Sequence, residues 1–337
     1  MPGKDNRELS EGIKQKAGEL GFNICGIARV RGLVENVVRL RDWIEAGMND
    51  KMAYLARDLD KRIDPGRVFS GAKSLVVTGL SYYSDVLQRD PEAPLLSRYT
   101  YGADYHGVVT GKLNRLLEWI QIVRPGVSGR AFSDNSSILE KPWGQEAGLG
   151  WQGRHSILIN KKIGSMFFIG ILILDTELEY DKPCTEDYCG TCRQCIEACP
   201  TGAINENRTI DARRCIANLT IENRGPIPAE FVPHLGKRIF GCDRCQEVCP
   251  WNHDPDVVSA PEFTISEEIA GMSVDEWKSL SRESFQRLFS TTAISRVKYE
   301  KLMNNIRDAL NLSLIHISEH TRLLSLSSAV FCLTKKQ

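Results

Sequence analysis

Net charge, long apolar runs and an apolar leader are all missing from this sequence. Its 43 Lys and Arg residues balance its 43 Asp and Glu residues, so the composition does not mark a nucleic-acid-binding protein. The longest apolar stretch, 166–174, is far shorter than the ~20 residues that cross a bilayer. The first sixteen residues are charged and lack the apolar core of a signal peptide. We therefore expect no transmembrane span and no secretion, and we predict a cytoplasmic protein.

Cysteine, by contrast, is abundant. The 337 residues include 11 cysteines, and nine of these lie between positions 184 and 249. The remaining composition, with 42% hydrophobic and 26% charged residues, is that of a globular protein of about two domains. Disulfides are rare in the reducing cytoplasm, so this clustering indicates metal or redox chemistry.

The spacing of the cysteines favours iron–sulfur clusters. Cys189-x2-Cys192-x2-Cys195-x3-Cys199-Pro200 is the run by which bacterial ferredoxins hold 4Fe-4S clusters, with the fourth thiolate crossing to a second cluster. Residues 242–250 repeat the last part of this run, and Cys215 can supply the ligand that the second run lacks. Cluster one is then predicted to bind Cys189, Cys192, Cys195 and Cys249. Cluster two is predicted to bind Cys199, Cys215, Cys242 and Cys245.

Structural zinc is the alternative for these thiols, because Cys-x2-Cys pairs also occur in zinc sites. Zinc ribbons do not favour a triple spacing that ends in Cys-Pro, and so we favour the clusters. Cys25 lies within an apolar stretch and is expected in the hydrophobic core. Cys184 is expected to be structural, because eight ligands are already assigned.

The spacing of apolar residues predicts an α/β (α+β) domain over residues 1–180. Helical spacing is found at 7–20, 33–46 and 105–123. Strands are predicted at 22–28, 74–80, 156–160 and 167–174. The last of these is apolar on both faces, which indicates a central strand of the sheet.

Two further parts follow along the chain. Residues 181–255 are predicted to form a ferredoxin-like domain that holds two 4Fe-4S clusters. Residues 256–311 are predicted to be a helical segment, with Trp277, Leu280 and Phe289 among its apolar anchors. Residues 312–337 continue no earlier pattern and resemble translated adapter sequence, so we treat them as a non-native tail.

A glycine-rich stretch matches the dinucleotide-binding fingerprint G-x-G-x-x-G at Gly148, Gly150 and Gly153. This fingerprint should follow a strand, but here it follows a run with helical character. We therefore interpret the stretch as a tight turn packed against a ligand rather than as a nucleotide site.

Eight short stretches of the chain form a specific combination. In the first half they are 104–106, 132–134 with Glu140, 147–151 and 164–165. In the second half they are 212–216, 219–220, 241–246 and 249–252. Together they resemble the epoxyqueuosine reductase family, cobalamin-dependent enzymes of queuosine tRNA modification. The resemblance runs to about residue 311 and implies a cobalamin-binding catalytic domain over 1–180, the two-cluster domain, and the start of a truncated C-terminal region of helical repeats.

The resemblance implies reduction of epoxyqueuosine to queuosine at the wobble position of tRNA, by cobalamin that two 4Fe-4S clusters supply with electrons. An acid must protonate the departing epoxide oxygen, because an alkoxide is a poor leaving group. The resemblance assigns this role to Asp134, which from the residues alone would be a turn or helix-capping residue. His106 is expected to orient the substrate or to pack in the site. The implied cobalamin contacts are Arg62, Ser97, Asp134, Leu158, Ile169, Cys242 and Asp243.

The chain departs from the family pattern next to these residues. It has Arg154-His155 where Lys-Asn is common, Lys141 where Arg is usual, and Asp134-Asn135-Ser136 where Asp-Thr-Gly is common. These changes concern the local geometry of the site rather than the class of protein.

Two other classes stay open on sequence grounds. A cobalamin-dependent reductive dehalogenase-like enzyme would share both cofactors, and a plain 4Fe-4S electron-transfer protein would need neither cobalamin nor an acid. The resemblance implies tRNA bearing epoxyqueuosine as a partner, an unidentified low-potential electron donor, no membrane and a monomer. Basic residues that could contact tRNA phosphates lie at 161–162, 213–214, 224 and 237–238.

Overall fold

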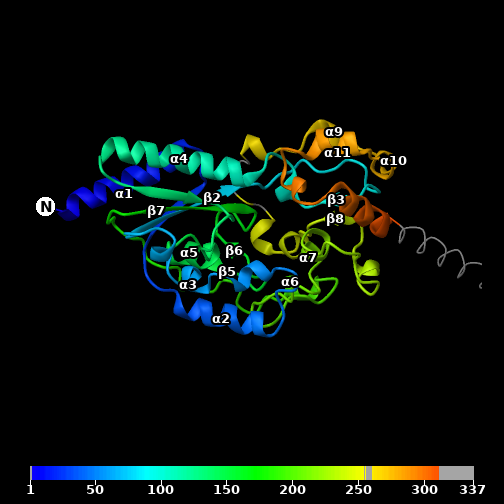
Figure 1. The fold of residues 1–337 in the computed structure, drawn as a ribbon, viewed down its shortest axis with the longest axis horizontal. Coiled ribbons are helices and arrows are strands. Elements are labelled where there is room, and N and C mark those ends of the chain that lie inside the picture. Colours follow the sequence, from blue (N-terminus) through cyan, green and yellow to red (C-terminus); the bar gives the residue numbers. More distant parts are fainter. Residues whose placement is uncertain (1, 254, 256–259, 311–337) are drawn as a thin grey trace, which may run out of the picture.

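The computed structural model of the protein describes residues 2–253, 255 and 260–310 (Figure 1). The segment 312–337, which we expect to be a non-native tail, lies outside the described residues. Within the described ranges, no helix has the length and the apolar character that a membrane crossing requires.

Four antiparallel strands form the central sheet of the first 180 residues, in the order β1-β2-β7-β4. Their bounds are Ile24–Arg29 (β1), Ser74–Ser81 (β2), Gly129–Phe132 (β4) and Phe167–Leu174 (β7). β2 and β7 pair along all of their residues, and every residue of both strands is buried. The prediction that 167–174 is a central strand is confirmed, because β7 lies between β2 and β4.

Helices cover both faces of this sheet (Figure 1). Their bounds are Pro2–Glu19 (α1), Val34–Glu45 (α2), Tyr105–Val123 (α4) and Glu140–Glu146 (α5). On one face, Ile13 of α1 and Leu113 of α4 share a core with Leu172 of β7. On the other face, Trp143 of α5 shares a core with Ile171 of β7. The helices predicted at 7–20, 33–46 and 105–123 are thus confirmed, the last with its predicted bounds and the other two with ends shifted by one to five residues.

The strand predicted at 156–160 is shorter than expected and lies outside the central sheet. Only Leu158–Ile159 (β6) is extended, and it pairs with Trp151–Gln152 (β5) in a separate two-stranded sheet. The backbone of the glycine-rich stretch closes tightly on this strand, since a Cβ atom on Gly150 would lie 1.9 Å from the carbonyl oxygen of Ile159. Gly148 adopts a positive φ of 74°, so the predicted tight turn is confirmed.

Short elements complete the first 180 residues and the cluster-binding part. In the first part they are Ala53–Ala56 (η1), Leu59–Ile63 (α3), Pro65–Arg67 (η2), Leu95–Leu96 (β3) and Arg98–Thr100 (η3). After residue 180 they are Gln194–Glu197 (α6), Ile216–Ile221 (α7), Val232–His234 (η4), Arg238–Phe240 (β8), Arg244–Glu247 (α8) and Pro250–Asn252 (η5). β3 pairs in parallel with β8, which joins the two parts of the chain.

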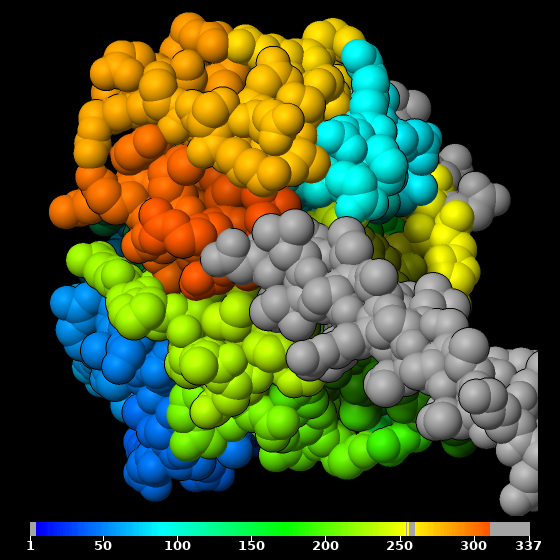
Figure 2. Space-filling view, turned by 90° about the vertical axis from the view of Figure 1, so that its right-hand side faces the viewer, coloured from blue at the N-terminus to red at the C-terminus, as the bar shows by residue number. Residues whose placement is uncertain are grey.

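The C-terminal segment is helical, as predicted. Its elements are Pro261–Phe263 (η6), Glu267–Gly271 (α9), Val274–Lys278 (α10), Arg282–Phe289 (α11), Ala293–Arg296 (η7) and a helical run over 299–310. Trp277 and Phe289 are fully buried, and their rings stack 6.0 Å apart. Figure 2 shows this segment (orange) directly above the cluster-binding part (yellow-green).

Two buried side chains of the last helical run hold it against the cluster-binding part. The Nζ atom of Lys301 donates to the carbonyl oxygens of Leu219 and Gly225, at 3.0 and 3.1 Å. The Nδ2 atom of Asn305 donates to the carbonyl oxygens of Thr220 in α7 and Ile239 in β8, at 2.9 and 2.8 Å. The C-terminal segment is therefore an integral support of α7 and β8.

Replacing Asn305 by leucine should destabilise the whole chain. The Asn305→Leu change leaves the buried carbonyl groups of Thr220 and Ile239 unpaired, which should lower the free energy of unfolding by about 2–3 kcal/mol. The measurement is the thermal midpoint at a fixed scan rate. Asn304→Leu, at the exposed neighbouring position, is the control and should change it little. Equal midpoints for Asn305→Leu and the unaltered chain would contradict this role.

Candidate active site and cluster ligands

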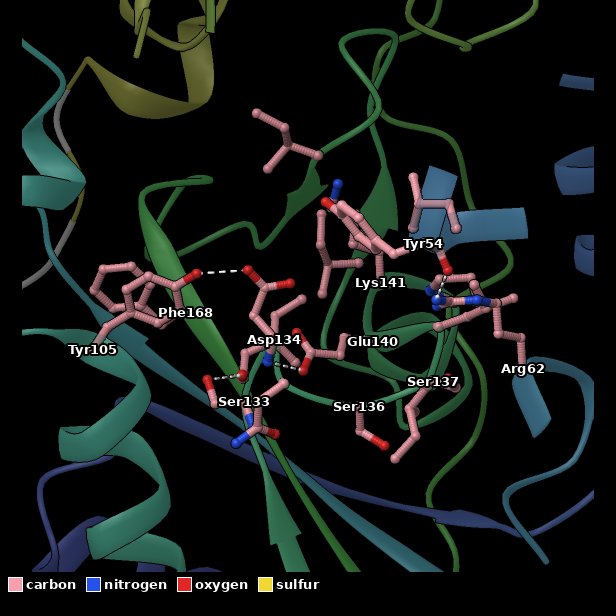
Figure 3. Close-up of a pocket in the computed structure, with 18 of the residues that line it drawn as sticks. Tyr54, Arg62, Tyr105, Ser133, Asp134, Ser136, Ser137, Glu140, Lys141 and Phe168 are labelled. Atoms are coloured by element: carbon pink, nitrogen blue, oxygen red, sulfur yellow. Dashed lines mark hydrogen bonds between the residues drawn. The ribbon is translucent and has the colours of Figure 1, made fainter. Parts of the chain in front are cut away.

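A cavity of about 710 Å³ opens beside the start of β7 (Figure 3). Phe167, Phe168 and Ile169 of β7 line it together with Leu158 of β6. Tyr54 and the helix that carries Arg62 line another side. The volume lies within the range of small-molecule sites, and an apolar surface with a few polar groups is their usual character.

Asp134 enters this cavity from the loop that follows β4. The loop is anchored to the central sheet, because the Oγ atom of Ser133 donates to the carbonyl oxygen of Ile169 at 2.9 Å. Asp134 has a positive φ of 55°, a conformation that non-glycine residues rarely adopt. Its backbone N–H donates to Oε1 of Glu140 at 2.5 Å, and its Oδ2 atom accepts from the hydroxyl of Tyr105 at 2.6 Å. The carboxyl group remains 63% exposed and faces the cavity (Figure 3).

Tyr105 is itself fixed between two rings. Its ring stacks on Phe168 at 4.2 Å and on His106 at 4.1 Å. Burial raises the pKa of Tyr105 far above its ordinary value, and the charge of Asp134 raises it further, so the hydroxyl stays a donor. His106 bonds through Nδ1 to Oδ1 of Asp104 at 2.6 Å, and its Nε2 atom lies 3.9 Å from Oδ2 of Asp134. His106 therefore packs in the site, which is one of its two expected roles.

Arg62 is a buried cation with an unused donor. It is only 7% exposed, and its Nη2 atom donates to the carbonyl oxygen of Tyr54 at 3.2 Å. Its Nε atom is buried without a hydrogen-bond partner among the described residues. Burial lowers the pKa of the guanidinium. A buried N–H group at a cavity wall fits a ligand whose edge carries acceptors, as the side chains of a corrin ring do.

The other predicted cobalamin contacts lie elsewhere. Ser97, Cys242 and Asp243 line a separate cavity of about 120 Å³ and not the larger one. The hydroxyl of Ser97 donates to Asp243, which also accepts from the backbone N–H of Arg98 at 2.7 Å. The structure therefore brings Arg62, Asp134, Leu158 and Ile169 together at the larger cavity. Ser97 and Asp243 are hydrogen-bonded to each other at the smaller one.

The structure has a second large cavity, of about 680 Å³, which the sequence does not predict. It shares Tyr54, Tyr105 and Asp134 with the first cavity and extends to Cys215 and Arg296. Its walls come from five segments that are far apart in the sequence, 43–54, 99–106, 134–141, 210–222 and 293–296. Figure 2 shows the last of these segments (orange) above the cluster-binding part (yellow-green). No local sequence signal marks such a site, because only the tertiary fold assembles it.

Four thiols gather around the first cysteine run. Burial raises the pKa of Cys249 to about 11, and the neighbouring thiolates of Cys189, Cys195 and Cys192 raise it as well. The Sγ atom of Cys189 accepts from the indole N–H of Trp151 at 3.4 Å. The late cysteine of the second run is thus a neighbour of the first three, which is the crossover that the spacing predicts for cluster one.

A second group gathers near α7. Burial raises the pKa of Cys245 well above its ordinary value, with further contributions from Cys242, Cys215 and Cys195. Burial also raises the pKa of Cys215, and the thiolate of Cys199 adds to the effect. These are the four thiols predicted for cluster two, with Cys195 as a link to the first group.

In the described part of the chain, no three His, Cys, Asp or Glu side chains come close enough to hold one metal ion. Cys25 packs against the core, where burial raises its pKa to about 12, as expected for a core residue. Cys184 and Cys189 both pack against the buried cluster of Trp151, Ile159 and Cys249.

Fold and site together define an iron–sulfur protein with an additional ligand-binding domain. Residues 188–252 match the sequence model of a 4Fe-4S double cluster binding domain. Residues 62–135 match the model described as epoxyqueuosine reductase QueG, DUF1730.

Curated relatives then show the family. The epoxyqueuosine reductase of Leadbetterella byssophila is 44% identical over 306 residues, which cover 89% of this chain and 98% of that protein. The epoxyqueuosine reductase of Escherichia coli K12 is 36% identical over 312 residues, which cover 91% of this chain and 82% of that protein. The chain belongs to the epoxyqueuosine reductase family.

Solved structures agree in fold. A selenomethionine-labelled epoxyqueuosine reductase superposes with a TM-score of 0.83 at 27% identity, covering 90% of this chain and 82% of that chain. An epoxyqueuosine reductase bound to an epoxyqueuosine-modified tRNA-Tyr stem loop gives a TM-score of 0.80 at 28% identity, covering 90% and 81%. The Bacillus subtilis enzyme, solved with its catalytic aspartate loop swung out of the active site, gives 0.79 at 27% identity, covering 90% and 82%.

Glu140 should make the stability of the protein depend on pH. Burial raises the pKa of Glu140 to about 8, and the charge of Asp134 raises it as well. The folded chain therefore holds a proton that the unfolded chain releases near pH 4.5, and stability should fall as the pH rises from about 4.5 to 8, by at most about 1.4 kcal/mol per pH unit. Thermal midpoints of the unaltered chain and of Glu140→Gln, prepared without corrinoid, should diverge across this range. Parallel pH curves would contradict the assignment.

Proposed function

We propose that this chain reduces the epoxide of epoxyqueuosine in tRNA to the alkene of queuosine, with Asp134 as the proton donor. The observation that carries the proposal is the carboxyl group of Asp134, held at the cavity by Tyr105 and Glu140. Similarity to epoxyqueuosine reductases over almost the whole of a curated relative supports the choice of substrate. A relative with a catalytic aspartate loop supports the choice of residue type.

The proposed reaction balances with two electrons and two protons. Both C–O bonds of the epoxide break, the two carbons become an alkene, and the oxygen leaves as water. An alkoxide leaves poorly, so a proton must reach the oxygen as the C–O bond breaks. The carboxyl group of Asp134 can supply this proton, because Tyr105 bonds only to Oδ2 and the carboxyl group faces the cavity.

Cobalamin is the cofactor that the family implies, and the residues at the larger cavity fit it. Its flat ring would lie against apolar side chains such as Leu158 and Ile169, and the free N–H of Arg62 would meet an acceptor at its edge. When bound, cobalamin supplies a strongly reducing cobalt centre for the two-electron step. We propose Arg62, Asp134, Leu158 and Ile169 as its contacts in this cavity, and Ser97, Cys242 and Asp243 as contacts beside the smaller one.

Electrons would reach this site through the two clusters. We propose the ligand sets inferred from the spacing: Cys189, Cys192, Cys195 and Cys249 for cluster one, and Cys199, Cys215, Cys242 and Cys245 for cluster two. Cys215 and Asp134 line the same second cavity, which supports cluster two as the one nearer to the site. An external donor of low potential must supply both electrons.

The proposed partner is tRNA that carries epoxyqueuosine, acted on in the cytoplasm by a monomer. The support is the similarity to a reductase solved with a tRNA stem loop. The basic residues singled out in the sequence add little, because several already have partners. Lys161 lies 3.6 Å over the ring of Tyr188, and Arg213 pairs with Asp211 at 2.8 Å. Recognition of an unstacked anticodon-loop base would rely on the cavity rather than on net charge.

Replacing Asp134 by asparagine should abolish most of the activity. The Asp134→Asn change keeps the size and an acceptor for Tyr105 but removes the acidic proton, so the rate should fall by at least about 100-fold. The measurement is nucleoside mass spectrometry of tRNA bearing epoxyqueuosine, incubated with protein loaded with clusters and cobalamin. An aryl halide offered in parallel tests the dehalogenase alternative. An undiminished rate in Asp134→Asn, or conversion of the halide alone, would refute the proposal.

Cluster assignments can be checked separately by iron content. Cys215→Ser should lose cluster two and with it half of the protein-bound iron, because Cys215 is a proposed ligand. Cys184→Ser is the matched control and should keep all of the iron. Equal iron in both variants would contradict the proposed ligand set.

A further inference from the structure

We propose that Glu140 is a positioning residue that holds Asp134 in the orientation needed for catalysis. The inference rests on the proposed function, because it concerns the acid of that reaction. Glu140 would act through the backbone of Asp134 rather than on the substrate.

The strained backbone of Asp134 needs an anchor. Its φ of 55° lies in the left-handed region, where a side chain raises the free energy of the backbone conformation. The hydrogen bond from the Asp134 N–H to Oε1 of Glu140, at 2.5 Å, acts on the strained residue itself. Because Glu140 is the first residue of α5, the bond links the tip of the loop to a helix packed on the central sheet through Trp143.

A second anchor acts on the other end of the same residue. The hydroxyl of Tyr105 holds Oδ2 of Asp134 at 2.6 Å, and Phe168 and His106 stack on the Tyr105 ring. The backbone bond to Glu140 and the side-chain bond to Tyr105 together restrict the rotation of the carboxyl group. With either bond missing, the carboxyl group could turn about the remaining one.

Glu140 is faced by few other charges. Asp134 and Lys141 interact with it, and Glu140 in turn acts on Tyr105. Burial and the charge of Asp134 raise the pKa of Glu140 to about 8, which favours the neutral form of its carboxyl group. Glutamine is a neutral side chain of the same length, and it keeps the acceptor.

The most direct test follows the backbone amide of Asp134 by hydrogen exchange with residue resolution, at pH 7, alongside steady-state kinetics on modified tRNA. Glu140→Gln retains the acceptor and should keep the exchange rate and kcat close to those of the unaltered chain. Glu140→Leu removes the acceptor, so the amide should exchange faster and kcat should fall at least about tenfold with KM unchanged, since small misplacements of a reacting group are costly.

Two further variants sharpen the comparison. Glu140→Asp keeps a carboxyl group but shortens the side chain by one methylene, so it should behave like Glu140→Leu even if the latter folds poorly. Glu146→Gln, at the far end of α5 where the carboxylate pairs with Arg31, is the control and should change neither readout.

The outcomes separate this inference from the proposed function. If Glu140→Asp and Glu140→Leu leave the amide protected and kcat intact, the positioning role is wrong. If Glu140→Gln fails as badly as Glu140→Leu, an acceptor is not what Glu140 provides, and the inference also fails. If the unaltered chain converts no epoxyqueuosine, the proposed function fails, while the exchange rates still decide whether Glu140 holds the loop.

Discussion

The full-length pairing of β2 with β7 is the constraint on which the site depends. Both strands are buried along their whole length, and alternate residues of β7 pack in the cores on the two faces of the sheet, so a slip by one residue would exchange the side chains of the two cores. This register places Phe168 and Ile169 at the cavity. β4 pairs with β7 and ends at Phe132, opposite Ile171. The carbonyl group of Ile169 then anchors Ser133, and the next residue is Asp134. The pairing of β2 with β7 thus determines the position of Asp134 at the cavity.

From this anchor outward, the site is assembled from parts that are far apart in the sequence. Tyr105 comes from the start of α4, Glu140 from the start of α5, and Arg62 from α3. The cluster-binding part contributes Cys215 to the second cavity, and the C-terminal segment contributes Arg296. The second cavity therefore draws on all three parts of the chain, and buried groups bond the C-terminal helical run to α7 and β8.

Local rules carried part of the prediction. Cysteine spacing predicted 4Fe-4S clusters, because ligand spacing follows from the geometry of a cluster, and the match to a 4Fe-4S double cluster binding domain supports them. Apolar runs predicted β7 as a central strand, because only a strand buried on both faces tolerates them. Tertiary packing shortens the strand predicted at 156–160 to the two-residue β6, which pairs only with β5. The predicted cofactor contacts Ser97 and Asp243 bond to each other, a link that no sequence pattern indicates. Glu140 belongs to a stretch that resembles the family, but the sequence gives it no role. Its hydrogen bond from the backbone N–H of Asp134 is visible only in the fold.

We propose that cofactor, acid and epoxide meet in the cavity beside the start of β7. The most direct measurement is anomalous diffraction at the cobalt absorption edge from crystals of the full chain with cobalamin and a stem loop carrying epoxyqueuosine. The account predicts one cobalt peak inside the cavity lined by Arg62, Asp134, Leu158 and Ile169, with the modified base next to Asp134. A cobalt peak in the smaller cavity of Ser97 and Asp243, or a base far from Asp134, would contradict it.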